Sequence, residues 1–180
     1  ELLAEGARYA SQQDARRAAR AFREAIALRP DKPTAYLNLG AALFISAMHV
    51  EAAQRYLQGR LRLPVGSKYW AMATAEAFDL LQLPECAEVA KPEWWNGEEL
   101  KALSARVVRA APENQLAINM RAMVLGGLSA GSWEAGPRSV AELSEAATLF
   151  DRAAALHPAP VAKANLAGYA ERCRRRAEAM

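Results

Sequence analysis

The sequence predicts an all-α protein built from tandem pairs of antiparallel helices. Hydrophobic residues are spaced helically almost throughout, and no stretch alternates convincingly enough to be a strand. Prolines divide the chain at helix-length intervals, and one motif of small, aromatic, small and proline residues recurs at fixed spacing. The 180 residues are 52% hydrophobic and 24% charged, a composition that supports a folded core.

Taken in order, helices are expected over 1–11, 14–29, 33–46, 49–62, 67–82, 96–110, 114–126, 139–156 and 160–178. Prolines such as Pro33 and Pro64 lie where these helices should start or stop, because proline lacks the amide donor that a helix interior needs. Asp31, Thr34 and Asn96 are plausible helix-start residues.

The recurring motif defines a repeat. It is formed by Ala18, Phe22, Ala25 and Pro30, then by Ala52, Tyr56, Gly59 and Pro64, and again by Ala146, Phe150, Ala153 and Pro158. Pro64 follows Pro30 by 34 residues, and Gly40 follows Gly6 by the same interval. Both helices of the first pair therefore recur in the second.

These residues resemble the tetratricopeptide repeat (TPR) family. Tyr36, Leu39 and Gly40 look like the first half of its motif, and Ala52, Tyr56 and Pro64 like the second. The first pair fits with Leu2, Gly6, Tyr9, Ala18, Phe22, Ala25 and Pro30, although Glu5 stands where the family usually has leucine. The resemblance implies a right-handed superhelix forming a single domain. Its repeats would be 1–30, 31–64, 65–112 (irregular), 113–158 (with an insertion) and a capping helix at 159–180.

The later pairs depart from the family pattern. About a dozen extra residues fall between the two helices of each pair, at 83–97 and at 126–138. Ser104 stands where the third pair should have its aromatic, and Met120 replaces the usual glycine of the fourth. Insertions at these places extend one edge of a repeat array without breaking its stacking.

Net charge and cysteine content exclude few classes of protein. The net charge of +3 is far below that of a dedicated nucleic-acid binder. Cys86 and Cys173 form no metal-binding spacing and fit a reducing compartment. With no apolar run of roughly 18 residues and no signal peptide at the start, we expect a soluble intracellular protein. Because the chain begins at Glu1 and not at methionine, a missing targeting segment or domain stays open, and so does the organelle.

The sequence offers no catalytic constellation, so we expect a protein that is not an enzyme and uses no cofactor or metal. His49 and His157 are isolated from each other and from the cysteines. The glycine-rich segment 126–131 follows no strand and lacks the lysine of a phosphate-binding loop, so a plain loop is the better interpretation.

The family resemblance implies a partner site on the surface made by the first helix of each pair. Its inward positions would be Leu3, Ala7, Ala10, Leu37, Asn38, Ala41, Phe44, Ala117, Ile118, Arg121 and Val124. This surface is mostly apolar and small, which suits a hydrophobic helix or extended segment. The alternative is that these side chains only pack against the next turn of the array.

Family members that hold the acidic tails of heat-shock chaperones use lysines, arginines and asparagines as a carboxylate clamp. Only Asn38 matches that set here, while Leu3, Ala7, Asn114 and Ile118 occupy the other positions. The sequence therefore argues against a chaperone-tail specificity.

Two further features allow a structural and a functional interpretation. Trp94, Trp95 and Trp133 lie in the insertions, where they would either anchor a partner or pin each loop to its own scaffold. The arginines around 15–23 and 172–176 are interspersed with acids or lie at a helix end, so a solvated face is favoured over nucleic acid.

The sequence therefore predicts a non-catalytic protein-interaction module or a scaffold subunit of a larger complex. A non-catalytic TPR domain of a larger transferase or hydroxylase, and an RNA-associated helical repeat protein, are the alternatives.

Overall fold

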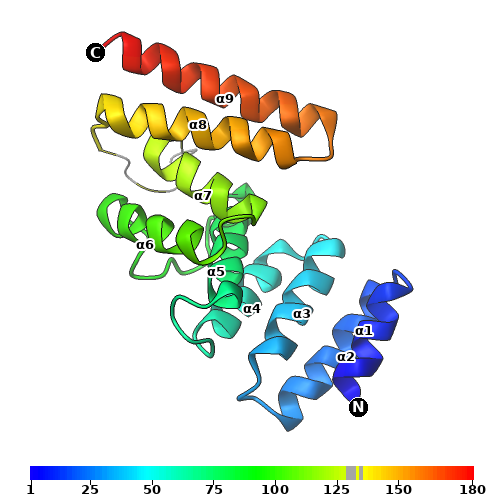
Figure 1. The fold of residues 1–180 in the computed structure, drawn as a ribbon. Coiled ribbons are helices and arrows are strands. Elements are labelled where there is room, and N and C mark those ends of the chain that lie inside the picture. The colour runs from blue at the N-terminus through cyan, green and yellow to red at the C-terminus, as the bar shows by residue number, and fades with distance from the viewer. Residues whose placement is uncertain (129–132, 134–135) are drawn as a thin grey trace. The chain divides into compact units, whose positions relative to one another are not determined.

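The computed structural model describes residues 1–128, 133 and 136–180, and all regular structure in these ranges is helical (Figure 1). The α-helices are α1 (Leu2–Ser11), α2 (Ala15–Leu28), α3 (Pro33–Ile45), α4 (His49–Arg60), α5 (Lys68–Leu81), α6 (Gly97–Ala110), α7 (Gln115–Gly126), α8 (Val140–Leu156) and α9 (Pro160–Glu178). Each expected helix is present with ends within two residues of prediction. The sequence did not predict η1 (Pro84–Cys86), a single 3₁₀ turn in the first insertion.

The chain forms two compact units, Glu1–Ala90 and Lys91–Met180. In unit 1, each helix from α1 to α5 packs against the next, and α1 also touches α3. In unit 2, α6 packs on α7, α7 on α8 and α8 on α9. The boundary lies inside the range 65–112, so α5 belongs to unit 1 and α6 to unit 2. The repeat limits expected from the sequence stay a prediction.

Several helices start where a side chain caps the first free amides. Asn96 accepts a hydrogen bond from the Glu99 amide, as the sequence predicted. At the start of α8, Ser139 and Glu142 bond each other's backbone in a capping box. The expectation for Asp31 and Thr34 is wrong: α3 begins directly at Pro33, whose fixed φ suits a first turn, and no side chain caps it.

The first two helix pairs share the same turn. Gln13 and Ala47, which are 34 positions apart, both adopt the left-handed backbone conformation, with φ of 61° and 56°. In both turns the following amide donates back to a carbonyl of the preceding helix, Asp14 to Tyr9 and Met48 to Leu43. This repetition confirms the tandem repeat at the level of backbone geometry.

The motif glycines and aromatics meet inside each of these pairs. A methyl group added to Gly6 would overlap the Phe22 ring, and one added to Gly40 would lie 3.0 Å from the Tyr56 ring. These aromatics fill the contact within a pair, because glycine lets the ring of the second helix approach the first.

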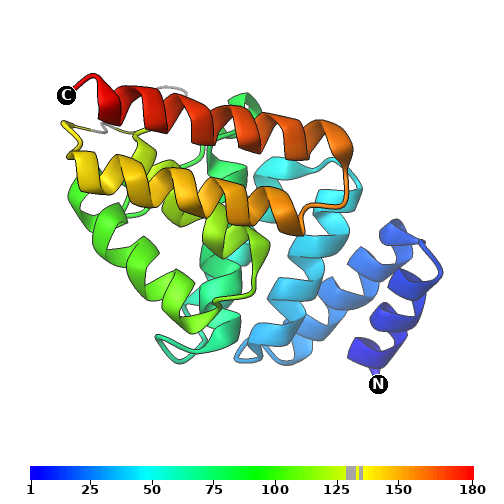
Figure 2. The ribbon, with the colours of Figure 1, turned by 45° about the horizontal axis from the view of Figure 1, so that its top comes forward.

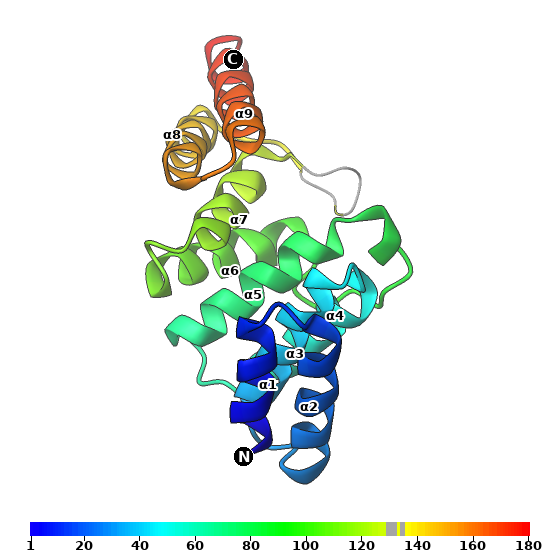
Figure 3. The ribbon, with the colours of Figure 1, turned by 90° about the vertical axis from the view of Figure 1, so that its right-hand side faces the viewer.

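Unit 2 has its own core around the third copy of the motif. Phe150 is fully buried with Ile118, Leu125 and Leu143, and Cys173 joins them from α9. Figures 1 and 2 show α8 and α9 side by side along their length, and Figure 3 views this pair end-on. Cys86 and Cys173 are both buried.

Candidate partner-binding groove

A groove of about 570 Å³ in unit 1 is lined mainly by the first helices of the two regular repeats, α1 and α3, with two residues from α2. Its lining residues are Ala7, Ala10, Gln13, Ala15, Phe22, Asn38, Ala41, Ala42 and Ile45. Four of these, Ala7, Ala10, Asn38 and Ala41, are among the inward positions expected from the sequence.

Small side chains on neighbouring helices create the groove. Ala7 and Ala10 are three residues apart on α1 and therefore share one helix face. Ala41 and Ala42 present equally short side chains from α3, which touches α1. The helices are close enough to form one surface, and the alanines leave space that larger residues would fill.

Two amides are the polar groups of the groove. Asn38 lies on α3 and is partly exposed, while Gln13 is exposed in the turn between α1 and α2. An amide side chain offers both a donor and an acceptor without a charge. The groove therefore combines apolar walls with two neutral hydrogen-bonding positions.

Large apolar side chains gather at the end of α3 beside the groove. Ile45 lines it and is 71% exposed, while the neighbouring Phe44 is 49% exposed. The Phe44 ring lies against the His49 imidazole, with 5.8 Å between centroids. These exposed apolar side chains are available for burial by a partner.

Three predicted partner-binding residues pack against neighbouring helices of their own unit and do not line the groove. Leu37 is half-buried against Gly59 of α4. Ile118 is fully buried, because α7 in this region is covered by the core that α8 and α9 complete. Arg121 donates to the Lys101 carbonyl and to a Glu145 carboxylate oxygen, so its guanidinium joins α6, α7 and α8.

The tryptophans occupy the insertions, as expected, and do not line the groove. Trp94 and Trp95 are half-buried and lie against each other, with ring centroids 5.7 Å apart. Trp133 is only 7% exposed, and the Arg138 guanidinium lies 6.0 Å from its ring centroid. Burial of Trp133 favours the self-packing interpretation. Residues 129–131 of the glycine-rich segment lie outside the described part of the chain.

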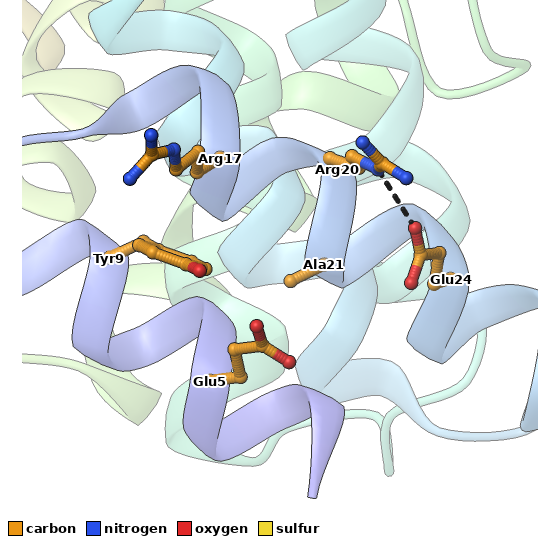
Figure 4. A pocket seen from close by; sticks show the side chains of 6 residues that line it. All are labelled: Glu5, Tyr9, Arg17, Arg20, Ala21 and Glu24. Atoms are coloured by element: carbon orange, nitrogen blue, oxygen red, sulfur yellow. Dashed lines mark hydrogen bonds and ion pairs between the residues drawn. The ribbon is translucent and has the colours of Figure 1, made fainter.

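A second, polar hollow of about 280 Å³ lies between α1 and α2 (Figure 4). Glu5 and Tyr9 face it from α1, while Arg17, Arg20, Ala21 and Glu24 face it from α2. Arg20 already bonds Glu24 at 3.0 Å, and the Arg17 guanidinium lies over the Tyr9 ring. Its charges of both signs select no single ligand.

The arginine clusters are largely paired with carboxylates. Arg23 of α2 bonds Glu51 of α4 at 2.9 Å, and Arg55 bonds the same carboxylate at 3.1 Å. Burial opposes ionisation of Glu51, but these two arginines outweigh it and hold its pKa below the usual range. Near the C-terminus, Arg174 pairs with Asp151 of α8. These arginines stabilise contacts between helices.

One acidic pair in unit 1 is of the opposite kind. Burial raises the pKa of Glu76 to about 7, with a further contribution from the charge of Asp79 one turn away on α5. Burial also raises the pKa of Asp79. This pair therefore makes folding sensitive to pH and is separate from the groove.

The comparisons with known proteins place this fold in a class. Residues 6–44, which include α2 and most of α1 and α3, match the family model described as TPR repeat. The solved structure of MamA, a TPR-like protein, is similar over 96% of this chain and 92% of MamA, with a TM-score of 0.56 and 12% identity. At that identity the likeness concerns the fold alone. No curated protein matches the chain.

Fold and repeats together define an α-helical repeat protein. Within that class the chain is TPR-like, as the sequence predicted. Proteins with TPR repeats are in general non-catalytic modules that bind other proteins. Among the helices described, none has both the length and the apolar character needed to span a bilayer.

Proposed function

We propose that this chain is a non-catalytic interaction module that binds an apolar helix of a partner protein in the groove between α1 and α3. The observation that carries the proposal is the groove itself, whose lining residues are apolar except for Gln13 and Asn38. It lies at the segment that matches the TPR repeat model.

The walls favour a helical partner over an extended one. The groove walls are α-helices, whose backbone amides and carbonyls are already paired along each helix. An extended segment would bury its own backbone groups against walls that offer them few partners, and each unpaired group would cost about 1–3 kcal/mol. A helix satisfies its backbone internally and presents only side chains.

The end of α3 supplies two large apolar side chains that a partner could bury. Ile45 and Phe44 are both substantially exposed. Fully burying a side chain of either kind contributes about 1.5–3 kcal/mol. Asn38 then fixes the register by hydrogen bonding to one polar side chain of the partner. The arrangement matches an apolar helix face carrying a single polar residue.

The direct test fills the groove without disturbing the fold. Ala41→Arg places a long charged side chain in the groove at an exposed helical position, where arginine is well tolerated. Ala102→Arg makes the same change at an exposed position of α6 and is the matched control. Tagged versions of both variants and the unchanged chain are purified from the native cell, and co-purifying proteins are identified by mass spectrometry.

We expect a protein recovered in stoichiometric amount with the unchanged chain and with Ala102→Arg, and lost with Ala41→Arg, while both variants keep the same helical circular dichroism. Equal recovery with Ala41→Arg and Ala102→Arg would contradict the groove as the binding site.

A further inference from the structure

Four large apolar side chains project into solvent at one end of unit 1. Leu28 is 71% exposed at the end of α2, and Leu61 is 76% exposed just after α4. Val65 and Tyr69, in the connection to α5 and its first turn, are 64% and 61% exposed. None of them lines the groove or the polar hollow.

The two segments that carry these side chains are held together as one edge. Arg62 donates through Nε to the Pro30 carbonyl at 2.7 Å and through Nη1 to the Gln58 carbonyl at 2.7 Å. Its guanidinium also lies 4.2 Å from the centroid of the Tyr36 ring. Figures 1 and 2 show the α2–α3 and α4–α5 connections at the same end of unit 1. We call residues 28–32 and 60–69 the basic–apolar edge.

This edge is strongly basic. Its two segments contain five basic residues and one acidic residue, Asp31. Asp31 is shared between Arg29 and Lys32, at 3.6 and 3.8 Å. Arg62 donates to carbonyl oxygens, so these bonds leave its positive charge uncancelled. Lys68 is the first residue of α5, where a cation opposes the helix dipole. An anionic surface would relieve that repulsion.

We propose that the basic–apolar edge docks on the surface of an anionic lipid bilayer. Leu28, Leu61 and Val65 would enter the boundary between headgroups and acyl chains, with Tyr69 at the headgroup level. Arg29, Lys32, Arg62 and Lys68 of the same edge would contact lipid phosphates, whereas Arg60 donates to the buried Thr74 hydroxyl and lies over the Trp70 ring. Apolar side chains surrounded by basic ones are the combination that holds a protein at a bilayer interface without crossing it.

The geometry favours a lipid surface over an acidic protein. The apolar side chains project outward from loops and helix ends. They line neither the groove nor the polar hollow, so they offer no pocket for a side chain of a partner. A fluid bilayer adapts to such protrusions, whereas a protein partner would need a matching concave surface. Since no residue of the edge lines the groove, this proposal and the proposed function can fail independently.

The test measures flotation of the chain with phosphatidylcholine vesicles that contain or lack phosphatidylserine. We expect binding only to the anionic vesicles and loss of binding at raised salt. Lys32→Gln with Lys68→Gln should weaken binding about tenfold or more, because each basic residue near such a surface contributes about fivefold. Leu61→Ser with Val65→Ser should also weaken it. The matched control is Val161→Ser with Lys163→Gln, which removes an equally exposed apolar residue and a lysine from α9.

A second measurement reports insertion directly. An environment-sensitive fluorophore attached to Val65→Cys should shift to the blue with anionic vesicles, while the same probe at Val161→Cys should not; both natural cysteines are buried. The proposal is overturned if the chain does not bind anionic vesicles, if the edge and α9 variants bind equally, or if the Val65 probe stays in water when bound. The proposal is also overturned if the chain does not bind vesicles but is bound through this edge by an acidic protein.

Discussion

Gly6 and Gly40 are conserved in position between the two regular repeats because an aromatic ring occupies the space of their missing side chain. The Phe22 ring lies directly against the Gly6 backbone, and Tyr56 lies in the same way against Gly40. Both rings belong to the second helix of the same pair. A single atom at these glycines therefore decides how closely the two helices can pack.

Gly6→Ala should destabilise the protein by about 1–3 kcal/mol, because the new methyl group overlaps the buried Phe22 ring and forces the helices apart. Gly168 of α9 is the matched control, since a methyl group added there meets no atom within 4 Å. Gly168→Ala should stabilise by about 0.5–1 kcal/mol through helix propensity alone. Urea denaturation of the two variants checks the opposite signs, and a shift of the same sign in both would contradict the packing argument.

At the scale of the elements, Arg121 connects three helices of unit 2. It lies on α7, donates to a carbonyl of α6 and pairs with Glu145 of α8, and its side chain is only 15% exposed. Lys101 of α6 forms a second link, to Glu142 of α8 at 2.5 Å. The sequence suggested Arg121 for partner binding, whereas these contacts indicate a role in joining the helices.

Arg121→Ala should lower the free energy of unfolding by about 1–3 kcal/mol, because it removes hydrogen bonds from a largely buried guanidinium and leaves the Lys101 carbonyl without that donor. Arg109→Ala, at an exposed position near the end of α6, should change stability by less than about 0.5 kcal/mol. Thermal and urea unfolding measure both, and equal stability of the two variants would show that the three-helix link is unimportant.

The helices were predictable because local chemistry determines where they begin and end. Prolines and an asparagine cap mark several of their ends, and the periodicity of 34 residues is visible in residues as unlike as Gly6 and Pro30. The 3₁₀ turn at Pro84–Cys86 was not predicted, because three residues provide no periodicity. The sequence pattern also did not indicate that the helices form two compact units.

The groove could be predicted only in part. Asn38 and Ala41, which the family resemblance assigned to the inward face of the first helix, line the groove. The same register applied to α7 selected Ile118, which is buried. Met120 stands where a glycine was expected, and α7 is apolar on several faces, so spacing alone could not separate its core face from an open one.

At the scale of the whole molecule, folding stability should depend on Glu76. Its pKa is raised to about 7 by burial and by Asp79, so the folded protein holds a proton that the unfolded chain releases above its usual pKa of 4.5. This stabilisation is complete below pH 4.5 and is lost as the pH rises through 7. Carboxyls with a lowered pKa, such as Glu142, act in the opposite direction at lower pH.

Between pH 5 and pH 8 the unchanged chain should therefore lose about 1–3 kcal/mol of stability through Glu76, at the lower end because that carboxyl is partly exposed. Glu76→Gln should remove this loss and be the more stable protein at pH 8. Glu98→Gln, at an exposed position, is the control. Urea denaturation at both pH values checks the prediction, which is contradicted if the three proteins show the same pH dependence.

The central claim is that the groove between α1 and α3 holds a helix of a partner protein. The most direct measurement places a photo-crosslinking amino acid at Ala41 in the groove or at Ala102 on α6, irradiates the native cell and maps the crosslinked peptides by mass spectrometry. We predict that the Ala41 probe captures one apolar helical segment of one protein and that the Ala102 probe does not. Capture of the same segment from both positions, or none from Ala41 while the partner still co-purifies, would contradict the account.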